Sequence, residues 1–230
     1  MGLIDLLFPT YCVICQRWGE YLCTRCFAKL SFDVKHLCCV CNKPSLDGLT
    51  HPACQNRYSL DGVFCALSYK HIINTLLYQF KYEPYLSHMA GFLSTLMYES
   101  LIQKEIVGEL LSRGEGVLIP IPLHRRRERV RGYNQSRLLA QKLGELVHMP
   151  VSNCLIRQKN TKAQFGLSPL ERKSNMRDAF VLTSNVEKSI VFLVDDVLTT
   201  GSTLMEAARI LKHNGVRRVY GLCLAREQDE

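Results

Sequence analysis

The sequence predicts an α/β fold in which helices flank a mostly parallel sheet, with a small metal-binding module in front of it. Three observations lead to this prediction. From residue 117 onward, short apolar runs alternate with stretches of helical apolar spacing, which is typical of parallel sheets. Eight of the 11 cysteines lie within residues 1–54, most of them in Cys-x-x-Cys pairs. One apolar run, residues 191–194, ends in two aspartates and a short loop of threonine, glycine and serine.

The composition is that of a folded protein that suits an anionic partner. The chain has 230 residues, 47% of them hydrophobic, which allows one well-buried domain and a small module. No apolar run approaches the ~18 residues of a membrane span, and residues 1–8 lack the basic region of a signal peptide. We therefore expect a cytoplasmic protein with no membrane span. The net charge of +8 favours a nucleotide, a polyphosphate or a nucleic acid as partner.

Residues 1–58 have the ligand spacing of a zinc module. Four pairs of potential ligands each have two residues between their members, which lets both side chains of a pair reach one ion. Two pairs complete one tetrahedral site, so four pairs predict two structural zinc ions with no open position for catalysis. Sequential pairing, the first pair with the second and the third with the fourth, is the expected arrangement, and cross-braced pairing is the open alternative. The predicted ligands are Cys12, Cys15, Cys23, Cys26, Cys38, Cys41, His51 and Cys54.

The other cysteines are not expected to bind metal. Cys39 is out of register with the pairs, and Cys65, Cys154 and Cys223 lie in apolar, strand-like stretches where a buried structural thiol is the usual state. Free or redox-active thiols are the competing interpretation of the paired set. A disulfide framework is disfavoured because the chain shows no export signal.

The second domain is predicted to span residues 59–230, and its first part, residues 59–112, to be a helical, hood-like segment. A strand is expected over 63–69, followed by a helix over 71–82 with apolar residues at helical spacing. Pro84 ends that pattern, and residues 85–112 are predicted to form one longer helix.

Residues 113–230 are predicted to form the core of the second domain. Because ligands bind beyond the carboxyl ends of parallel strands, the loops after Ile121, Ile156 and Asp195 should converge on one cleft. Gly215 is a typical residue to follow the end of a helix. The expected strands are 117–121, 151–156, 179–182, 190–195 and 216–224, and the expected helices are 134–148 and 202–214.

The segment that follows residues 191–194 has the pattern of a phosphate-binding loop. Backbone N–H groups and the positive end of a helix dipole would face an anion, and the hydroxyl groups would add donors. Adjacent carboxylates at the strand end suit the hydroxyl groups of a ribose. An ordinary turn with polar caps is the competing interpretation. The candidate residues are Asp195, Asp196, Thr199, Thr200, Gly201, Ser202 and Thr203.

Two further loops are basic. The first is expected to bind pyrophosphate or a DNA backbone, since guanidinium groups match phosphate geometry, although a solvated charge run is the alternative. The second, roughly residues 157–177, is long and polar and is expected to be a lid over a charged ligand, with disorder as the alternative. The candidates in the first loop are Arg125, Arg126, Arg127, Arg129, Arg131, Asn134 and Gln135, and those in the lid are Gln164, Arg172 and Asn175.

The motifs in this order resemble a known family. Residues 191–203 resemble the phosphoribosyl pyrophosphate (PRPP) motif of type I phosphoribosyltransferases. Together with the paired cysteines, Ile-Pro-Ile-Pro, Arg-Gly-Tyr-Asn-Gln and the Arg172/Asn175 segment, they make nearly the whole chain similar to the ComF competence-protein family. The resemblance implies a double zinc ribbon fused to a phosphoribosyltransferase-like domain. By the same resemblance, Asp195 and Asp196 would face the ribose hydroxyls and residues 199–203 would hold the 5′-phosphate.

The resemblance implies handling or uptake of DNA, in natural transformation or in the use of DNA as a nutrient. We expect the cleft and basic loop to bind single-stranded DNA, with Tyr133 or Phe165 available to stack on bases. An active Mg²⁺-dependent phosphoribosyltransferase that binds PRPP is the first alternative, with an acceptor that the sequence does not identify. The second alternative is an adaptor whose zinc module binds a helicase-type competence partner.

Overall fold

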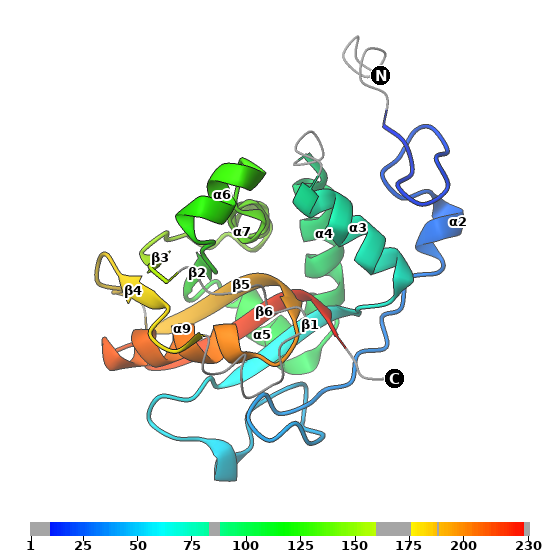
Figure 1. Ribbon diagram of the computed structural model, residues 1–230. Coiled ribbons are helices and arrows are strands. Elements are labelled where there is room, and N and C mark those ends of the chain that lie inside the picture. Colours follow the sequence, from blue (N-terminus) through cyan, green and yellow to red (C-terminus); the bar gives the residue numbers. More distant parts are fainter. Residues whose placement is uncertain (1–9, 83–87, 160–175, 188, 228–230) are drawn as a thin grey trace.

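The computed structural model describes residues 10–82, 88–159, 176–187 and 189–227, and its centre is a four-stranded parallel sheet (Figure 1). The strand order is β1-β6-β5-β2. β5 pairs with β2 on one side and with β6 on the other, so its carboxyl end lies in the middle of the sheet edge. The strands are β1 (Gly62–Ser68), β2 (Val117–Pro120), β5 (Ile190–Leu198) and β6 (Arg218–Arg226). The predicted parallel sheet is confirmed.

Helices cover both faces of this sheet. The first face packs against α3 (His71–Tyr82), α4 (Met89–Ile102) and α7 (Gln135–Val147), and the second packs against α9 (Ser202–His213). Alternation along β5 supplies both cores, because Phe192 and Val194 belong to the first and Val191 and Leu193 to the second. The sheet is therefore buried on both faces, as its nearly uninterrupted apolar strands predict.

The N-terminal residues form two separate units rather than one compact module. Residues 10–28, with the short α2 (Thr24–Phe27), lie beside α3, where Val13 and Leu22 join the first core. Residues 34–58, with the 3-10 helix η1 (Pro52–Cys54), lie by β1, where Val34 joins the second core. Figure 1 shows the two units at different sides of the sheet. No described helix is long and apolar enough to cross a membrane.

The structure corrects the prediction of one helix over 85–112. Its described part is two helices, α4 and α5 (Glu105–Ser112), because Lys104 between them is extended, with φ −90° and ψ 132°. The turn brings Gly108 against the Ile102 carbonyl oxygen, which a Cβ at residue 108 would meet at 2.6 Å. Apolar residues continue at helical spacing through the turn, so the sequence pattern could not predict the break between the two helices.

The arginine-rich segment is a helix, α6 (Arg125–Arg131), and not a loop. His124 caps it by accepting the N–H of Arg126 at Nδ1, 3.3 Å away, and Gly132 ends it in the left-handed region at φ 84°. Apolar spacing could not predict this helix because none of its residues is buried.

Two of the predicted strands lie outside the parallel sheet. β3 (Leu155–Arg157) and β4 (Phe180–Leu182) form their own antiparallel pair, and Val151 makes only an isolated bridge to Leu118. Strand β5 continues past the predicted end at residue 195, through both aspartates, to Leu198. The two acids are therefore successive strand residues, whose side chains point in opposite directions.

Candidate functional site

Four cysteine thiols of the first N-terminal unit converge on one point. The Sγ atoms of Cys12, Cys15, Cys23 and Cys26 all lie within 4.8 Å of one another, and those of Cys15 and Cys23 are 3.5 Å apart. A zinc ion with Zn–S bonds of about 2.3 Å holds the sulfurs of a tetrahedron about 3.8 Å apart. This first cluster therefore fits one structural zinc ion.

The second N-terminal unit holds a matching set, the second cluster, formed by Cys38, Cys41, His51 and Cys54. His51 Nδ1 lies 3.3 Å from Cys41 Sγ, and His51 Nε2 lies 2.9 Å from the Pro44 carbonyl oxygen. The contact with Pro44 orients the ring so that Nδ1 faces the cluster, as is usual for zinc-bound histidine. Three thiols and one imidazole are a normal zinc ligand set.

The grouping of these ligands is sequential and not cross-braced, because each cluster uses two pairs that follow one another in the chain. Cys39 belongs to neither cluster, and its Sγ lies 3.5 Å from Thr50 Oγ1. Its Cβ lies 3.7 Å from the point where a Cβ on Gly201 would sit. The second cluster is therefore next to the predicted phosphate loop.

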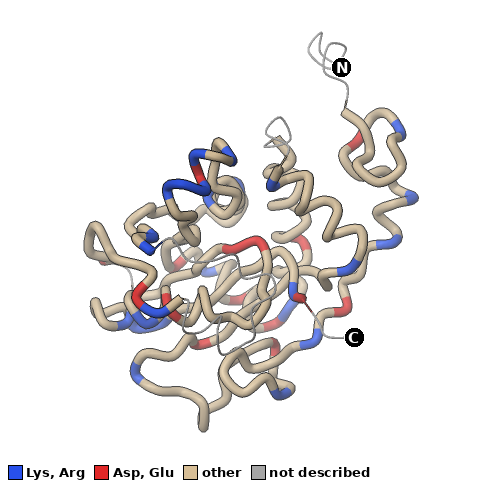
Figure 2. The backbone as a smooth tube through the Cα atoms, viewed as in Figure 1, with Lys and Arg blue, Asp and Glu red and all other residues tan. Residues whose placement is uncertain are grey.

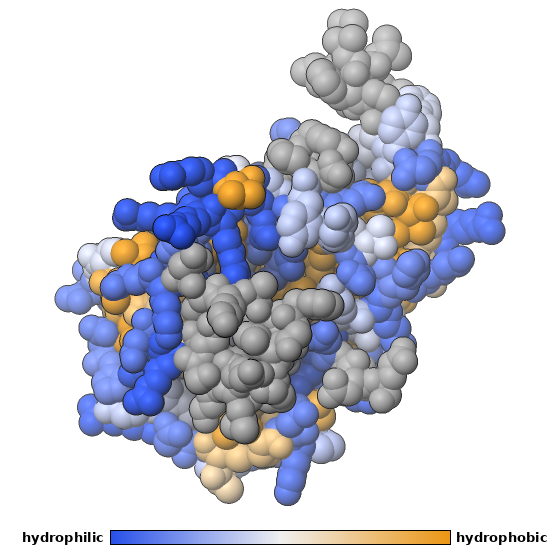
Figure 3. Space-filling view, viewed as in Figure 1, coloured by the Kyte–Doolittle hydropathy of each residue, from blue (hydrophilic) through white to orange (hydrophobic). Residues whose placement is uncertain are grey.

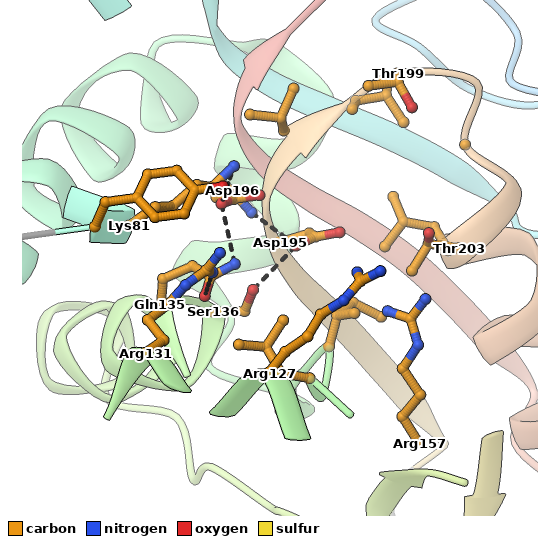
Figure 4. Close-up of a pocket in the computed structure, with 17 residues that line it drawn as sticks. Lys81, Arg127, Arg131, Gln135, Ser136, Arg157, Asp195, Asp196, Thr199 and Thr203 are labelled. Atoms are coloured by element: carbon orange, nitrogen blue, oxygen red, sulfur yellow. Dashed lines mark hydrogen bonds and ion pairs between the residues drawn. The ribbon is translucent and has the colours of Figure 1, made fainter. Parts of the chain in front are cut away.

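A cavity of about 310 Å³ opens at the carboxyl ends of β2 and β5, and we call it the cleft (Figure 4). Its position confirms that the loops after Ile121, Ile156 and Asp195 converge. Its polar lining comes from four parts of the chain: α3, the α6–α7 region, the end of β3, and β5 with the following loop. These residues are Lys81, Tyr82, Arg127, Arg131, Gln135, Ser136, Arg157, Asp195, Asp196, Thr199 and Thr203.

Asp196 is paired within the protein. The Lys81 ammonium lies 2.7 Å from Asp196 Oδ2, and the Gln135 amide donates to the same oxygen over 3.2 Å. Arg131 in turn donates to Oε1, the side-chain amide oxygen of Gln135, over 2.5 Å. Burial alone would raise the pKa of Asp196, but the charge and hydrogen bond of Lys81 outweigh it and hold the pKa below its ordinary value. Asp196 is therefore an ionised anchor for α3.

Asp195 points the other way, into the cleft (Figure 4). Asp195 Oδ1 accepts hydrogen bonds from Ser136 Oγ at 3.0 Å and from the Asp196 backbone N–H at 2.9 Å. Burial and the neighbouring charge of Asp196 raise the pKa of Asp195 to about 7. The sequence predicts the same role for both acids, facing a ribose, and does not indicate that their environments differ. Of the two, only Asp195 is directed at the cleft with no cation in contact among the residues that the structure describes.

The opposite wall of the cleft suits an anion. The loop after β5 reaches α9 through Gly201, whose φ of 73° places it in the left-handed region. Thr199 and Thr203 line the cleft, whereas the hydroxyl groups of Thr200 and Ser202 bond each other over 2.8 Å. The 12-residue helix α9 begins at Ser202, so the positive end of its dipole lies at this wall.

Two guanidinium groups complete that wall, from Arg127 on α6 and Arg157 at the end of β3. The Arg157 side chain is buried, lies 5.8 Å from the Phe180 ring centroid, and contacts Met176 Sδ at 3.2 Å. Burial and the nearby charge of Arg127 lower the pKa of Arg157 to about 10, so it stays protonated at neutral pH. Two cations on one wall of a cavity favour a multiply charged anion there.

The structure divides the predicted basic residues into two groups. Arg127 and Arg131 line the cleft, whereas Arg125, Arg126 and Arg129 are exposed on α6 outside it. Asn134 does not line the cleft: it caps α7 by accepting the Ser136 N–H at 3.0 Å and donates to the Ile121 carbonyl oxygen, also at 3.0 Å. Figure 2 shows the basic α6 facing the acidic end of β5.

The remaining predictions concern the stacking residues and the lid. Tyr133 is held by Phe80, since its hydroxyl donates to the Phe80 carbonyl oxygen and its ring packs 6.0 Å from the Phe80 ring, and its stacking on a base stays a prediction. Phe165 and the three lid candidates, Gln164, Arg172 and Asn175, lie outside the described residues.

Four polar cleft residues were not named from the sequence, although the predicted lid segment begins at the last of them: Lys81, Tyr82, Ser136 and Arg157. Ser136 directly follows the Arg-Gly-Tyr-Asn-Gln motif, and Arg157 directly follows a strand whose end was expected at the cleft. The position of each next to a predicted cleft segment could therefore have identified it. Lys81 and Tyr82 had no such position, because the contact of Lys81 with Asp196 joins residues 115 positions apart.

Comparisons with known proteins agree with this architecture. Residues 3–57 match a double zinc ribbon domain and residues 133–229 a phosphoribosyl transferase domain. DNA utilization protein YhgH of Shigella flexneri is 33% identical over 96% of this chain and 99% of that protein. Competence protein ComFC of Bacillus subtilis is 29% identical over 85% of this chain and 80% of that protein. Competence protein F of Haemophilus influenzae is 42% identical over 47% of this chain and 49% of that protein. The chain therefore belongs to the ComF competence-protein family, as its motifs predicted.

Proposed function

We propose that this protein handles single-stranded DNA in the cytoplasm and that its cleft binds a ribose phosphate such as PRPP. PRPP would enter with Mg²⁺ on its pyrophosphate. The names of the relatives, which refer to competence and to DNA utilization, support a role in DNA handling. The two zinc clusters would stabilise the fold and take no part in chemistry. A helicase-type partner stays a prediction, because nothing in the cleft bears on it.

The observation that carries the ribose-phosphate proposal is the position of Asp195. Its carboxylate enters a cavity whose opposite wall holds Arg127, Arg157 and the start of α9. A ribose 5-phosphate can place its hydroxyl groups on the carboxylate and its phosphate at the helix start. The two guanidinium groups then suit a second phosphate group, as in a pyrophosphate at C1.

The DNA proposal rests on the exposed arginines of α6. Arg125, Arg126 and Arg129 project from the helix outside the cleft, and Figure 3 shows a hydrophilic surface here with one apolar spot, in keeping with the exposed Val130. Exposed guanidinium groups on one short helix can follow successive phosphates of a strand. A strand held there would lie beside the cleft, so one protein could hold a DNA backbone and a sugar phosphate together.

Calorimetry with ribose 5-phosphate, and with PRPP plus Mg²⁺, tests the cleft. Arg127→Gln should weaken binding by about 1.5–3 kcal/mol, the range for hydrogen bonds to charged groups. Arg126→Gln is the matched control, because residue 126 is the neighbouring arginine but does not line the cleft. If neither compound binds the wild-type protein, the ribose-phosphate proposal is wrong.

The salt dependence of DNA binding tests the α6 surface. Each phosphate contact on a single strand contributes a slope of about −0.7 in log affinity against log salt. Replacing Arg126 and Arg129 together by glutamine should therefore flatten the slope by about 1.4, and Arg127→Gln should change it less. An unchanged slope in the double variant would exclude α6 as the DNA contact.

A phosphoribosyltransferase is the second candidate, favoured by one observation. Lys81 and Tyr82, from the segment predicted to be hood-like, reach the cleft beside Asp196. An acceptor base could enter there, opposite the pyrophosphate wall. Release of pyrophosphate from Mg²⁺-PRPP in the presence of nucleobases, abolished by Asp195→Ala, would establish this candidate.

A further inference from the structure

Helix α3 exposes two aromatic residues on the face where an amphipathic helix normally carries polar ones. Its apolar residues are buried, but Tyr78 is 60% exposed and Tyr82 is 58% exposed. They are four residues apart and so lie one turn from each other on the same face. Neither ring is packed in the hydrophobic core, so core packing does not explain why these residues are aromatic. The buried residues of α3 are Ile72, Ile73, Leu76, Leu77 and Phe80.

The two rings form one surface that continues onto a cation of α6. The ring centroids of Tyr78 and Tyr82 are 4.9 Å apart with an interplanar angle of 46°. The Arg131 guanidinium lies over the Tyr82 ring, 5.4 Å from its centroid. We call Tyr78, Tyr82 and Arg131 the aromatic platform. It bridges α3 and α6 at the rim of the cleft, which Tyr82 and Arg131 also line.

The platform is unlike the tyrosine beside it. Tyr133 uses its hydroxyl to bind the Phe80 carbonyl oxygen and packs its ring on Phe80, so it is part of the fold. Among the described residues, none hydrogen-bonds the phenol of Tyr78 or Tyr82. Large exposed aromatic faces next to a polar cavity commonly mark a binding surface.

We propose that the aromatic platform stacks the unpaired bases of a single-stranded nucleic acid whose backbone lies on α6. The proposal rests on the proposed DNA function and names the residues that contact the bases. Every base presents a π face, so tyrosine and arginine planes bind bases with little sequence preference. The exposed arginines of α6, Arg126 and Arg129, lie on the helix that also supplies Arg131, so bases and phosphates would each meet a matching surface.

Stacking and backbone contacts can be separated with two probes. Fluorescence anisotropy would compare oligothymidylate with an abasic oligonucleotide of the same length and charge. The wild-type protein should bind oligothymidylate more tightly. The double variant Tyr78→Ala/Tyr82→Ala should lose this preference, with oligothymidylate binding weakened about 5- to 150-fold, because one stacked base contributes about 1–3 kcal/mol. Its affinity for the abasic probe should stay within about twofold of wild type.

The double variant Tyr78→Phe/Tyr82→Phe is the matched control, since it keeps both rings and should restore the preference. Zinc content and melting temperature would show whether the alanine variant is folded; if it is not, the single change Tyr78→Ala, which lies outside the cleft, replaces it. Equal wild-type affinity for the two probes would overturn the proposal that the platform stacks bases, but it would leave the proposal of backbone binding on α6 in place. Normal oligothymidylate binding by a folded alanine variant would also overturn it and would favour a protein partner for this surface. If the wild type binds neither probe, the DNA function itself fails.

Discussion

The two sides of the cleft are built from equivalent parts that have different partners. On the helix side, the first zinc cluster packs by α3, whose Lys81 pairs with Asp196. On the loop side, the second zinc cluster lies by Gly201, and Asp195 faces the cleft between the loop and Arg127. Each side thus has one zinc cluster and one aspartate. On the helix side, the aspartate is paired with an ammonium group, whereas on the loop side the aspartate is hydrogen-bonded by Ser136 and points into the cavity.

The difference shows that two adjacent, identical residues can have opposite electrostatic states. Burial acts to raise the pKa of both carboxyl groups, but the Lys81 ammonium, 2.7 Å from Asp196, lowers the pKa of Asp196 below its ordinary value, whereas the pKa of Asp195 stays raised. Strand alternation causes this division, because it turns one carboxylate toward α3 and the other away from it. We therefore expect the acid pair to work as one structural and one ligand-binding group.

Loss of zinc should have the largest effect and should differ between the two sides. A structural zinc ion contributes on the order of 10 kcal/mol of apparent folding energy to its module. Cys38→Ser should lose one zinc ion and weaken ribose 5-phosphate binding at least tenfold, because Cys39 packs beside Gly201 and Asn42 contacts Arg226 at 3.3 Å.

Cys12→Ser is the matched variant on the helix side. It should also lose one zinc ion, and it should loosen the unit that contacts α3, where Gln79 donates to the Val13 carbonyl oxygen at 3.5 Å. Its effect on ribose 5-phosphate affinity should be smaller than that of Cys38→Ser. Metal analysis and calorimetry measure both quantities, and equal losses of affinity would contradict the assignment of the clusters to different sides.

Breaking the Lys81–Asp196 pair should have the next largest effect. Removing one partner of a buried pair costs about 3–5 kcal/mol, and the 23% exposure of the Lys81 side chain reduces the expected loss for Lys81→Met to about 2 kcal/mol. Urea unfolding at pH 7 measures this loss. Because the pKa of Asp196 is depressed, the stabilisation is present at neutral pH and should disappear as the pH falls below about 4.

Lys142→Met is the control for this comparison. Lys142 pairs with Glu145 over 2.9 Å on the exposed surface of α7, so its loss should cost less than about 0.5 kcal/mol. Similar costs for Lys81→Met and Lys142→Met would mean that Asp196 is not anchored as the structure indicates.

The smallest expected effect has the opposite sign. Between pH 4 and about 7 the folded protein holds a proton on Asp195 that the unfolded chain has released, so this group lowers the free energy of unfolding as the pH rises. Asp195→Asn should therefore stabilise the protein at pH 8, by on the order of 1 kcal/mol, and should have no effect near pH 4. Melting curves at both values measure the difference. A destabilised variant at pH 8 would show that the hydrogen bonds from Ser136 and the Asp196 N–H stabilise the protein more than the buried charge destabilises it.

Much of the architecture could be predicted from the sequence because its causes are local. Cys-x-x-Cys spacing places two ligands on one ion whatever the rest of the chain does, and short apolar runs between helical stretches indicated the parallel strands. The segment from Val191 to Thr203 carried its strand, its acids and its loop in one continuous motif. In each case the residues that interact are close together in the chain.

The tertiary structure decided how those parts meet. Sequential zinc pairing, the docking of two separate zinc units and the division of labour between Asp195 and Asp196 all depend on contacts between distant residues. The arginines of α6 look equivalent in the sequence, yet helix geometry turns Arg127 toward the cleft and Arg126 away from it. A single sequence records the spacing of neighbours but not the long-range packing that gives each charge its partner, and burial makes that partner decisive for its pKa.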